Sequence, residues 1–132
     1  MNIPTEAVKA VIENKLREIL FLQRNPSTRD TNNWDLPGGL VEDGELLEIA
    51  LRREITEELG LEDIEVGERV GEWSFFRPLD GKTVHVTNLK CRLLGGTLIR
   101  LKEDEHIAFT WVKRDGATSL RVKDPSLFDA LG

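Results

Sequence analysis

Residues 36–61 read LPGGLVEDGELLEIALRREITEELGL, and this stretch determines the fold that we expect for the chain. From residue 45 to residue 59 it contains no proline or glycine, and most of its residues are good helix formers. Gly60 stands where a left-handed cap would end a helix. The stretch therefore predicts a helix of about four turns over residues 45–59.

The predicted helix carries apolar residues and carboxylates on the same side. With about 100° of rotation per residue, one broad sector faces the core and contains Leu47, Ala50, Leu51 and Ile55. Glu54, Glu57 and Glu58 fall largely into that sector, and burying ionised carboxylates costs several kcal/mol unless a cation compensates. Oxygen ligands of this kind suit magnesium or manganese. The alternative is an ordinary surface helix with ion pairs around Arg53.

The spacing of these residues resembles the Nudix box. Residues 39–61 hold every fixed position of the box, and Leu36-Pro37-Gly38-Gly39 is the usual lead-in; the fixed positions are Gly39, Glu45, Arg53, Glu54, Ile55, Glu57, Glu58, Gly60 and Leu61. The resemblance to MutT-like Nudix hydrolases implies an α/β fold. It would be the family's α/β/α sandwich, with a mixed β-sheet and the box loop and helix at the active site. At 132 residues the chain suits one such domain, residues 1–132.

The resemblance also implies an activity. Nudix enzymes hydrolyse a nucleoside diphosphate linked to another group, with Mg²⁺ as cofactor and Mn²⁺ as a substitute. The metal ligands carried over to this sequence are the Gly38 carbonyl, Glu54, Glu57 and Glu58. These three glutamates are also the expected catalytic acids of the box.

Residues around these acids are expected to complete the catalytic set. Arg53 is included with Glu45 as a brace between helix and loop. The acid that deprotonates the attacking water is either a box glutamate or one from the later segment KEDEH, residues 102–106. Within that segment Glu105 is preferred over Glu103. His106 is expected to be a loop or packing residue.

Substrate contacts are expected outside the box. Arg24 lies fourteen residues before Gly38, where similar triphosphatases place a phosphate-binding arginine, and a planar guanidinium suits phosphate. Four aromatic residues could stack on a base, of which one or two are expected in the pocket, and Trp34 and Phe75 are preferred; the four are Trp34, Trp73, Phe75 and Phe76. The alternatives are a surface charge for Arg24 and core packing for the aromatic residues.

The remaining elements follow from hydrophobic pattern and turn residues. We expect a β-hairpin formed by residues 7–12 and 16–23, a loop at residues 25–33 and a short strand at residues 34–36. Further strands are expected near residues 64–76, 83–93 and 109–112. Turns are expected at residues 78–81 and 95–96, and a short helix at residues 125–131.

Composition limits the partners. A net charge of −6 without a basic stripe argues against binding polymeric nucleic acid, whereas a small nucleotide remains compatible because a metal supplies local positive charge. No stretch approaches the length of a membrane span and no leader segment is evident, so we expect a cytoplasmic protein without membrane contact. The family resemblance also allows a homodimer.

Three functions stay open at this level. The first is hydrolysis of a nucleoside triphosphate, standard or modified, to monophosphate and pyrophosphate. The second is hydrolysis of ADP-ribose or a nucleotide sugar, which Pro78 favours because it lies near a proline found in such hydrolases. The third is a nucleotide-sensing module without activity. Such modules usually lose box acids, and this chain retains all of them.

Overall fold

The computed structural model describes residues 5–25, 33–95 and 98–132. Seven strands and the helix α1 (Leu47–Leu59) form the body of the fold; the strands are β1 (Thr5–Ile12), β2 (Glu18–Arg24), β3 (Trp34–Asp35), β4 (Gly38–Leu40), β5 (Ile64–Arg77), β6 (Lys82–Leu93) and β7 (His106–Lys113). Two short helices follow β7, namely α2 (Arg114–Ala117) and the 3-10 helix η1 (Pro125–Ala130).

The strands form two sheets that share the core. The larger sheet has the order β4-β1-β6-β5, in which β1 and β6 are parallel and the other pairs are antiparallel. The smaller sheet has the order β3-β2-β7 and is antiparallel. The prediction of a mixed sheet is therefore confirmed.

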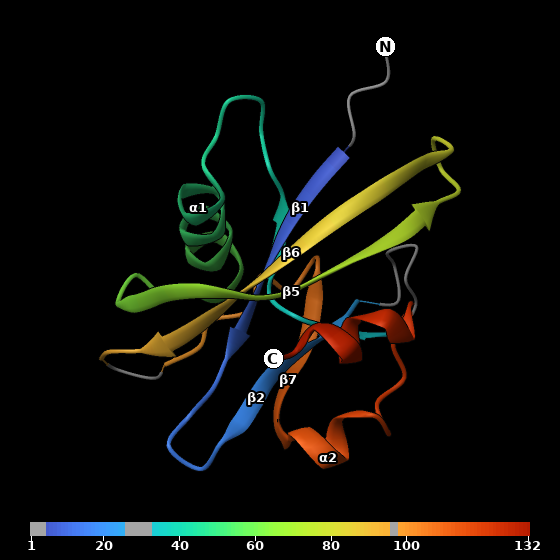
Figure 1. The fold of residues 1–132 in the computed structure, drawn as a ribbon. Helices are drawn as coiled ribbons and strands as arrows, with labels where there is room; N and C mark the ends of the chain where they lie inside the picture. Colours follow the sequence, from blue (N-terminus) through green and yellow to red (C-terminus); the bar gives the residue numbers. More distant parts are fainter. Residues whose placement is uncertain (1–4, 26–32, 96–97) are drawn as a thin grey trace.

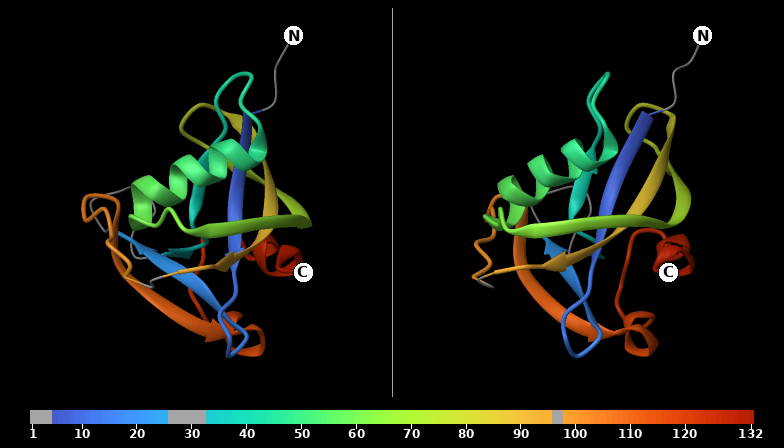
Figure 2. Two further views of the ribbon diagram at one scale, coloured as in Figure 1. Left: turned by 90° about the vertical axis from the view of Figure 1, so that its left-hand side faces the viewer. Right: turned by 60° about the vertical axis from the view of Figure 1, so that its left-hand side comes forward.

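Both faces of β1 are covered, which explains its unbroken run of buried residues from Ala7 to Ile12. Val8, Ala10 and Ile12 join the core cluster beneath α1. Val11 points the other way and joins a second cluster with residues of α2 and η1. Helix α1 and the C-terminal short helices thus lie on opposite sides of the sheets, as the α/β/α prediction required (Figure 1; Figure 2).

The predicted hairpin of the first two strands is wrong. β1 and β2 are joined by a tight turn in which the Asn14 carboxamide accepts hydrogen bonds from the amides of Leu16 and Glu18. Near the turn, Glu13 bridges to Ile19 and the Asn14 backbone amide donates to the Glu18 carbonyl, but β1 pairs with β6 over eight residues and β2 pairs with β7. The local pattern showed the strands and the turn but not these long-range partners.

The other elements agree with the sequence to within a few residues. α1 begins at Leu47, two residues later than expected, and Gly60 ends it with φ 67° in the left-handed region. Strands β5 and β6 match their predictions closely, and β7 begins earlier, at His106. Most of the predicted loop at residues 25–33 lies outside the described residues, as does Gly96 of the predicted turn. No helix in the described ranges is long and apolar enough to cross a membrane.

Candidate active site

Strand β4, which the sequence did not predict, carries the double glycine to the helix. It pairs antiparallel with β1, and Gly38 lies opposite Lys9. Gly38 has φ 141°, and a Cβ there would lie 2.1 Å from the Val8 carbonyl oxygen. A Cβ on Gly39 would lie 2.5 Å from the carboxylate carbon of Glu54. The glycines are therefore needed because the backbone approaches both β1 and the helix acids closely.

Glu58 is the most deeply buried acid of the helix. It is 3% exposed, and its Oε1 accepts a hydrogen bond of 2.8 Å from the Gly38 amide. Burial raises the pKa of Glu58 to about 8, although Lys9 and the Gly38 amide act in the opposite direction. A cation next to this buried carboxylate would stabilise its ionised form.

Glu54 lies one helical turn before Glu58, and its side chain is 16% exposed. Its Oε1 accepts a hydrogen bond of 2.9 Å from Arg53. Burial is the largest cause of a raised pKa at Glu54, and the Arg53 charge opposes it. The Glu54 carboxylate lies beside Gly39 and Glu58 accepts from the Gly38 amide, so both side chains point towards β4.

Arg53 connects the helix to the loop before it. Its Nε and Nη2 donate to the two carboxylate oxygens of Glu45 at 3.0 and 2.9 Å, and Nη2 also donates to the Leu40 carbonyl at 3.2 Å. This bidentate contact lowers the pKa of Glu45. Arg53 is absent from the lining of the cleft that holds the acids.

The prediction that Glu57 shares the inward sector is wrong. Its side chain is 53% exposed, and its Oε1 lies 3.9 Å from Arg53 Nη1. One residue corresponds to about 100° of rotation, so Glu57 lies on the flank of the helix when Glu58 faces the sheet. The carboxylate is near the other acids but on the solvent side of them.

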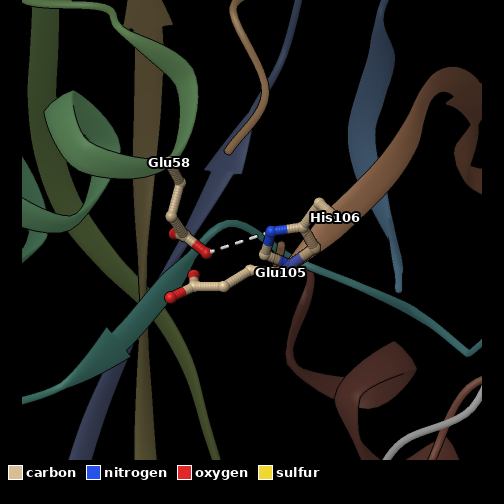
Figure 3. A group of neighbouring side chains, drawn as sticks. All are labelled: Glu58, Glu105 and His106. Carbon is tan, nitrogen blue, oxygen red and sulfur yellow. Dashed lines mark ion pairs between the residues drawn. The ribbon is translucent and has the colours of Figure 1, made fainter. Parts of the chain in front are cut away.

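The first residue of β7 and the residue before it contribute two more groups beside Glu58. Ligand atoms of Glu58, Glu105 and His106 all lie within 4.8 Å of one another; Figure 3 shows Glu58 on α1 and His106 at the start of β7, with Glu105 beside them. His106 is 1% exposed, and its Nδ1 lies 3.7 Å from Glu58 Oε2. This nitrogen has no hydrogen-bond partner among the described residues. Burial lowers the pKa of His106 to about 4, and Arg24 and Lys9 contribute.

These groups fit a divalent cation. Burial raises the pKa of the carboxyls of Glu54 and Glu58, so a cation beside them would stabilise their ionised forms, and the unpartnered Nδ1 of His106 lies next to Glu58. Glu105 is half-buried on the same cleft, whereas Glu103 is exposed and does not line it. His106 is buried at the start of β7, which agrees with the packing alternative rather than with a loop.

One cleft of about 670 Å³ joins the acids to the predicted substrate residues. Gly38, Glu54, Glu58 and Glu105 line one part of it, and Arg24, Trp34 and Phe75 also line it. Arg24 ends β2 as expected. The cleft therefore contains several carboxylates, the guanidinium group of Arg24 and two aromatic side chains.

Several cleft residues were not predicted from the sequence: Lys9, Asp35, Arg77 and Lys123. Lys123 Nζ lies 5.1 Å from the centre of the Phe75 ring. Lys9 did leave a signal in the sequence, because a lysine within the apolar run AVKAVI is rare on a buried strand unless it has a partner. The other three have no local pattern that marks them.

A second hollow of about 1040 Å³ is larger but contains none of the predicted site residues. It lies beside the β1–β2 turn and is lined in part by Leu16, Phe109 and Trp111. Converging buried acids, rather than size, mark a hydrolytic site, so we assign the chemistry to the smaller cleft.

The stability of the metal-free protein should fall as the pH rises from about 6.5 to about 8.5. A carboxyl whose folded pKa is raised contributes stability at low pH and loses it as the pH passes its folded pKa, which is about 8 for Glu58. The depressed pKa of His106 acts between about pH 4 and 6.5, where its slope opposes that of Glu58, so the net fall is expected above about pH 6.5. The charged or titratable groups around Glu58 are Lys9, Asp35, Glu54, Glu105 and His106. Thermal melts in chelator should show this slope, and Glu58→Gln should flatten it; an equal slope in the variant would contradict the assignment.

Comparisons with known proteins give a consistent result. A model of the NUDIX domain family matches residues 4–131. A putative 8-oxo-dGTP diphosphatase 2 of Mycobacterium tuberculosis is 40% identical over 96 residues, which are 71% of this chain. The match spans only 63% of that relative's length.

Two further relatives match over more of their length. A CTP pyrophosphohydrolase of Escherichia coli is 36% identical over 112 residues, covering 85% of this chain and 78% of the relative. The crystal structure of a MutT protein from Methanosarcina mazei Go1 superimposes with a TM-score of 0.83 at 27% identity, covering 99% of this chain and 93% of that one.

Proposed function

This chain belongs to the Nudix family, and from that premise we propose that it is a metal-dependent pyrophosphohydrolase of nucleoside triphosphates, standard or modified. The observation that carries the proposal is that one cleft is lined by the buried Glu58, by the half-buried Glu54 and Glu105, and by the substrate candidates Arg24, Trp34 and Phe75. Two relatives named for triphosphate substrates, 8-oxo-dGTP and CTP, support this choice.

The proposed metal ligands are the residues around β4. Glu54, Glu57, Glu58 and the Gly38 carbonyl would hold the ion, which we propose to be Mg²⁺ with Mn²⁺ as a substitute. When bound, the ion neutralises charge on the phosphates and makes the attacking water more acidic. Glu57 is exposed on the flank of the helix and does not line the cleft, so it would be the outermost ligand.

The protein residues divide the remaining work. Glu105 lines the cleft next to Glu58 and is the proposed acceptor of the water proton. Water forms a bond to phosphorus, the anhydride P–O bond breaks, and the products are a nucleoside monophosphate and pyrophosphate. Arg53 acts as a positioning residue, because it fixes Glu45, Glu54 and the Leu40 carbonyl and does not line the cleft.

Substrate binding would use the other wall of the cleft. Arg24 presents a cation on the same surface as the acids, where it can donate to phosphate oxygens. Trp34 and Phe75 are half-buried, so each can offer part of its ring to a base. The nucleotide would place its base against these rings and its phosphates towards Glu58.

The ADP-ribose alternative receives less support. Pro78 lies in the turn between β5 and β6 and is absent from the lining of the cleft. Its presence is explained by the turn. A purely sensing module is disfavoured because the box acids are all present and two of them, Glu54 and Glu58, line the cleft.

A substrate panel tests the proposal directly. Purified protein with Mg²⁺ or Mn²⁺ should be assayed against nucleoside triphosphates, ADP-ribose, nucleotide sugars and dinucleoside polyphosphates. Release of pyrophosphate and monophosphate from triphosphates is the expected result. Ribose 5-phosphate and AMP from ADP-ribose would instead establish the second function, and binding without hydrolysis would establish the third.

Replacing Phe75 should weaken substrate binding without slowing the chemical step. Stacking of a base on an aromatic ring contributes about 1–3 kcal/mol, so Phe75→Leu should raise KM by about 5- to 100-fold while kcat stays near its original value. Phe76→Leu is the matched control, since Phe76 is the next residue of β5 and is 60% exposed. Steady-state kinetics with both variants would show this difference, and an unchanged KM for Phe75→Leu would exclude the stacking role.

A further inference from the structure

Lys9 is a charged residue at the centre of a buried strand. It is 8% exposed, and both strand neighbours, Val8 and Ala10, are fully buried. A lysine is rarely buried to this extent unless its ammonium group is paired. Neither the box nor the predicted hydrolytic roles involve this residue.

The ammonium group of Lys9 is held by the last residue of β3 and by the residue that follows it. Nζ lies 3.0 Å from Asp35 Oδ2 and donates to the Leu36 carbonyl at 3.3 Å. At the backbone, Lys9 lies opposite Gly38, whose amide binds Glu58. Lys9 is thus joined to the strand that contacts the helix acids.

The charge of Lys9 also acts on those acids. Lys9, Asp35, Glu54 and Glu58 all line the same cleft. The Lys9 charge opposes the effect of burial on the pKa of both Glu54 and Glu58. In the protein without metal, Lys9 therefore offsets part of the cost of holding these carboxylates together.

We propose that Lys9 is a positioning residue that acts as an internal counter-ion for the cleft acids Asp35, Glu54 and Glu58. This inference rests on the proposed function only in that a divalent ion binds two of these acids, Glu54 and Glu58. Because the ammonium group and the divalent ion are both positive, they are anticooperative. Lys9 stabilises the metal-free cleft and weakens binding of the metal.

The test compares Lys9→Met with Lys90→Met, which makes the same change at an exposed position on β6. Thermal midpoints are measured in chelator and in saturating Mg²⁺, and the dissociation constant of Mg²⁺ is measured by calorimetry without nucleotide. The buffer is held at about pH 9, above the Glu58 pKa of about 8, so that proton release contributes little.

Lys9→Met should lower the thermal midpoint in chelator, increase the rise of the midpoint that Mg²⁺ causes, and tighten Mg²⁺ binding by roughly tenfold. Lys90→Met should respond to Mg²⁺ as the wild type does.

Asp35→Asn provides an independent arm with the opposite sign. It leaves the Lys9 charge without its carboxylate partner, so the Mg²⁺-induced rise should be smaller than in the wild type and Mg²⁺ binding should weaken. This arm decides the matter if Lys9→Met does not fold in either buffer. The Asp35→Asn arm also decides the matter if Lys9→Met folds only in Mg²⁺, because a purely structural loss would give the same result.

A purely structural role for Lys9 predicts a different pattern. Both midpoints of Lys9→Met would then fall by the same amount, and the dissociation constant of Mg²⁺ would not change. The proposal would be overturned if the two thermal midpoints of Lys9→Met fell by the same amount. It would also be overturned if Asp35→Asn bound Mg²⁺ as the wild type does. Since no nucleotide is present, failure of the triphosphate assay would leave these results interpretable.

Discussion

Glu58→Gln should reduce the turnover of the best nucleotide substrate by a factor of about 10² to 10⁴ while the protein stays folded. Glu58 is the buried acid that touches Gly38 and faces Glu105 and His106, so it is central to the proposed metal group. Glutamine has the same shape and can still accept the hydrogen bond from the Gly38 amide. The change removes a buried charge, so the thermal midpoint without metal should stay the same or rise.

The control for this variant lies on the same helix. Glu48→Gln removes a charge from an exposed side chain in the first turn of α1 and should leave turnover unchanged. Glu57→Gln tests the exposed acid, and under the proposed ligand set its turnover should fall in the same range. Rates in initial-velocity assays at saturating Mg²⁺ give the comparison. Turnover like that of the wild type in both Glu57→Gln and Glu58→Gln would refute the metal-dependent mechanism.

Gly38→Ala should lower the free energy of unfolding by about 3 to 5 kcal/mol. The residue has φ 141°, which L side chains rarely adopt, and the added Cβ would overlap the Val8 carbonyl oxygen and Lys9 Cα. Neither obstacle is the flexible end of a side chain, so β4 would have to move away from β1. The hydrogen bond to Glu58 would be displaced with it, and activity would be lost together with stability.

Two other glycines separate the causes of this effect. Gly116→Ala adds a methyl group in the short helix α2, where nothing lies within 4 Å, and should be neutral or slightly stabilising. Gly44 has φ 77° and open space around it, so Gly44→Ala should show the backbone strain alone. Urea unfolding of the three variants should rank Gly38→Ala far below the others. A loss for Gly38→Ala no greater than that for Gly44→Ala would show that the contact with β1 adds nothing.

Much of the site follows from local sequence because its chemistry is concentrated in one helix. The helix, its cap at Gly60 and the inward direction of Glu54 and Glu58 all depend on a repeat of 3.6 residues, which can be read without knowing the fold. The same rule failed for Glu57, since a residue on the edge of the sector is buried only if a neighbouring element covers it. The local pattern contains no information about that neighbour.

The sequence by itself determined the family, the helix with its carboxylates and the order of most strands, because these depend on residues close together in the chain. Only the tertiary structure decided that β1 and β2 separate into different sheets, and that β4 returns to β1 and places Gly38 against Glu58. It also decided that Lys9 and Asp35 meet beside the acids, although twenty-six residues separate them. Such contacts depend on which strands pair over long distances, and that choice is made by the burial of the whole core rather than by any local segment.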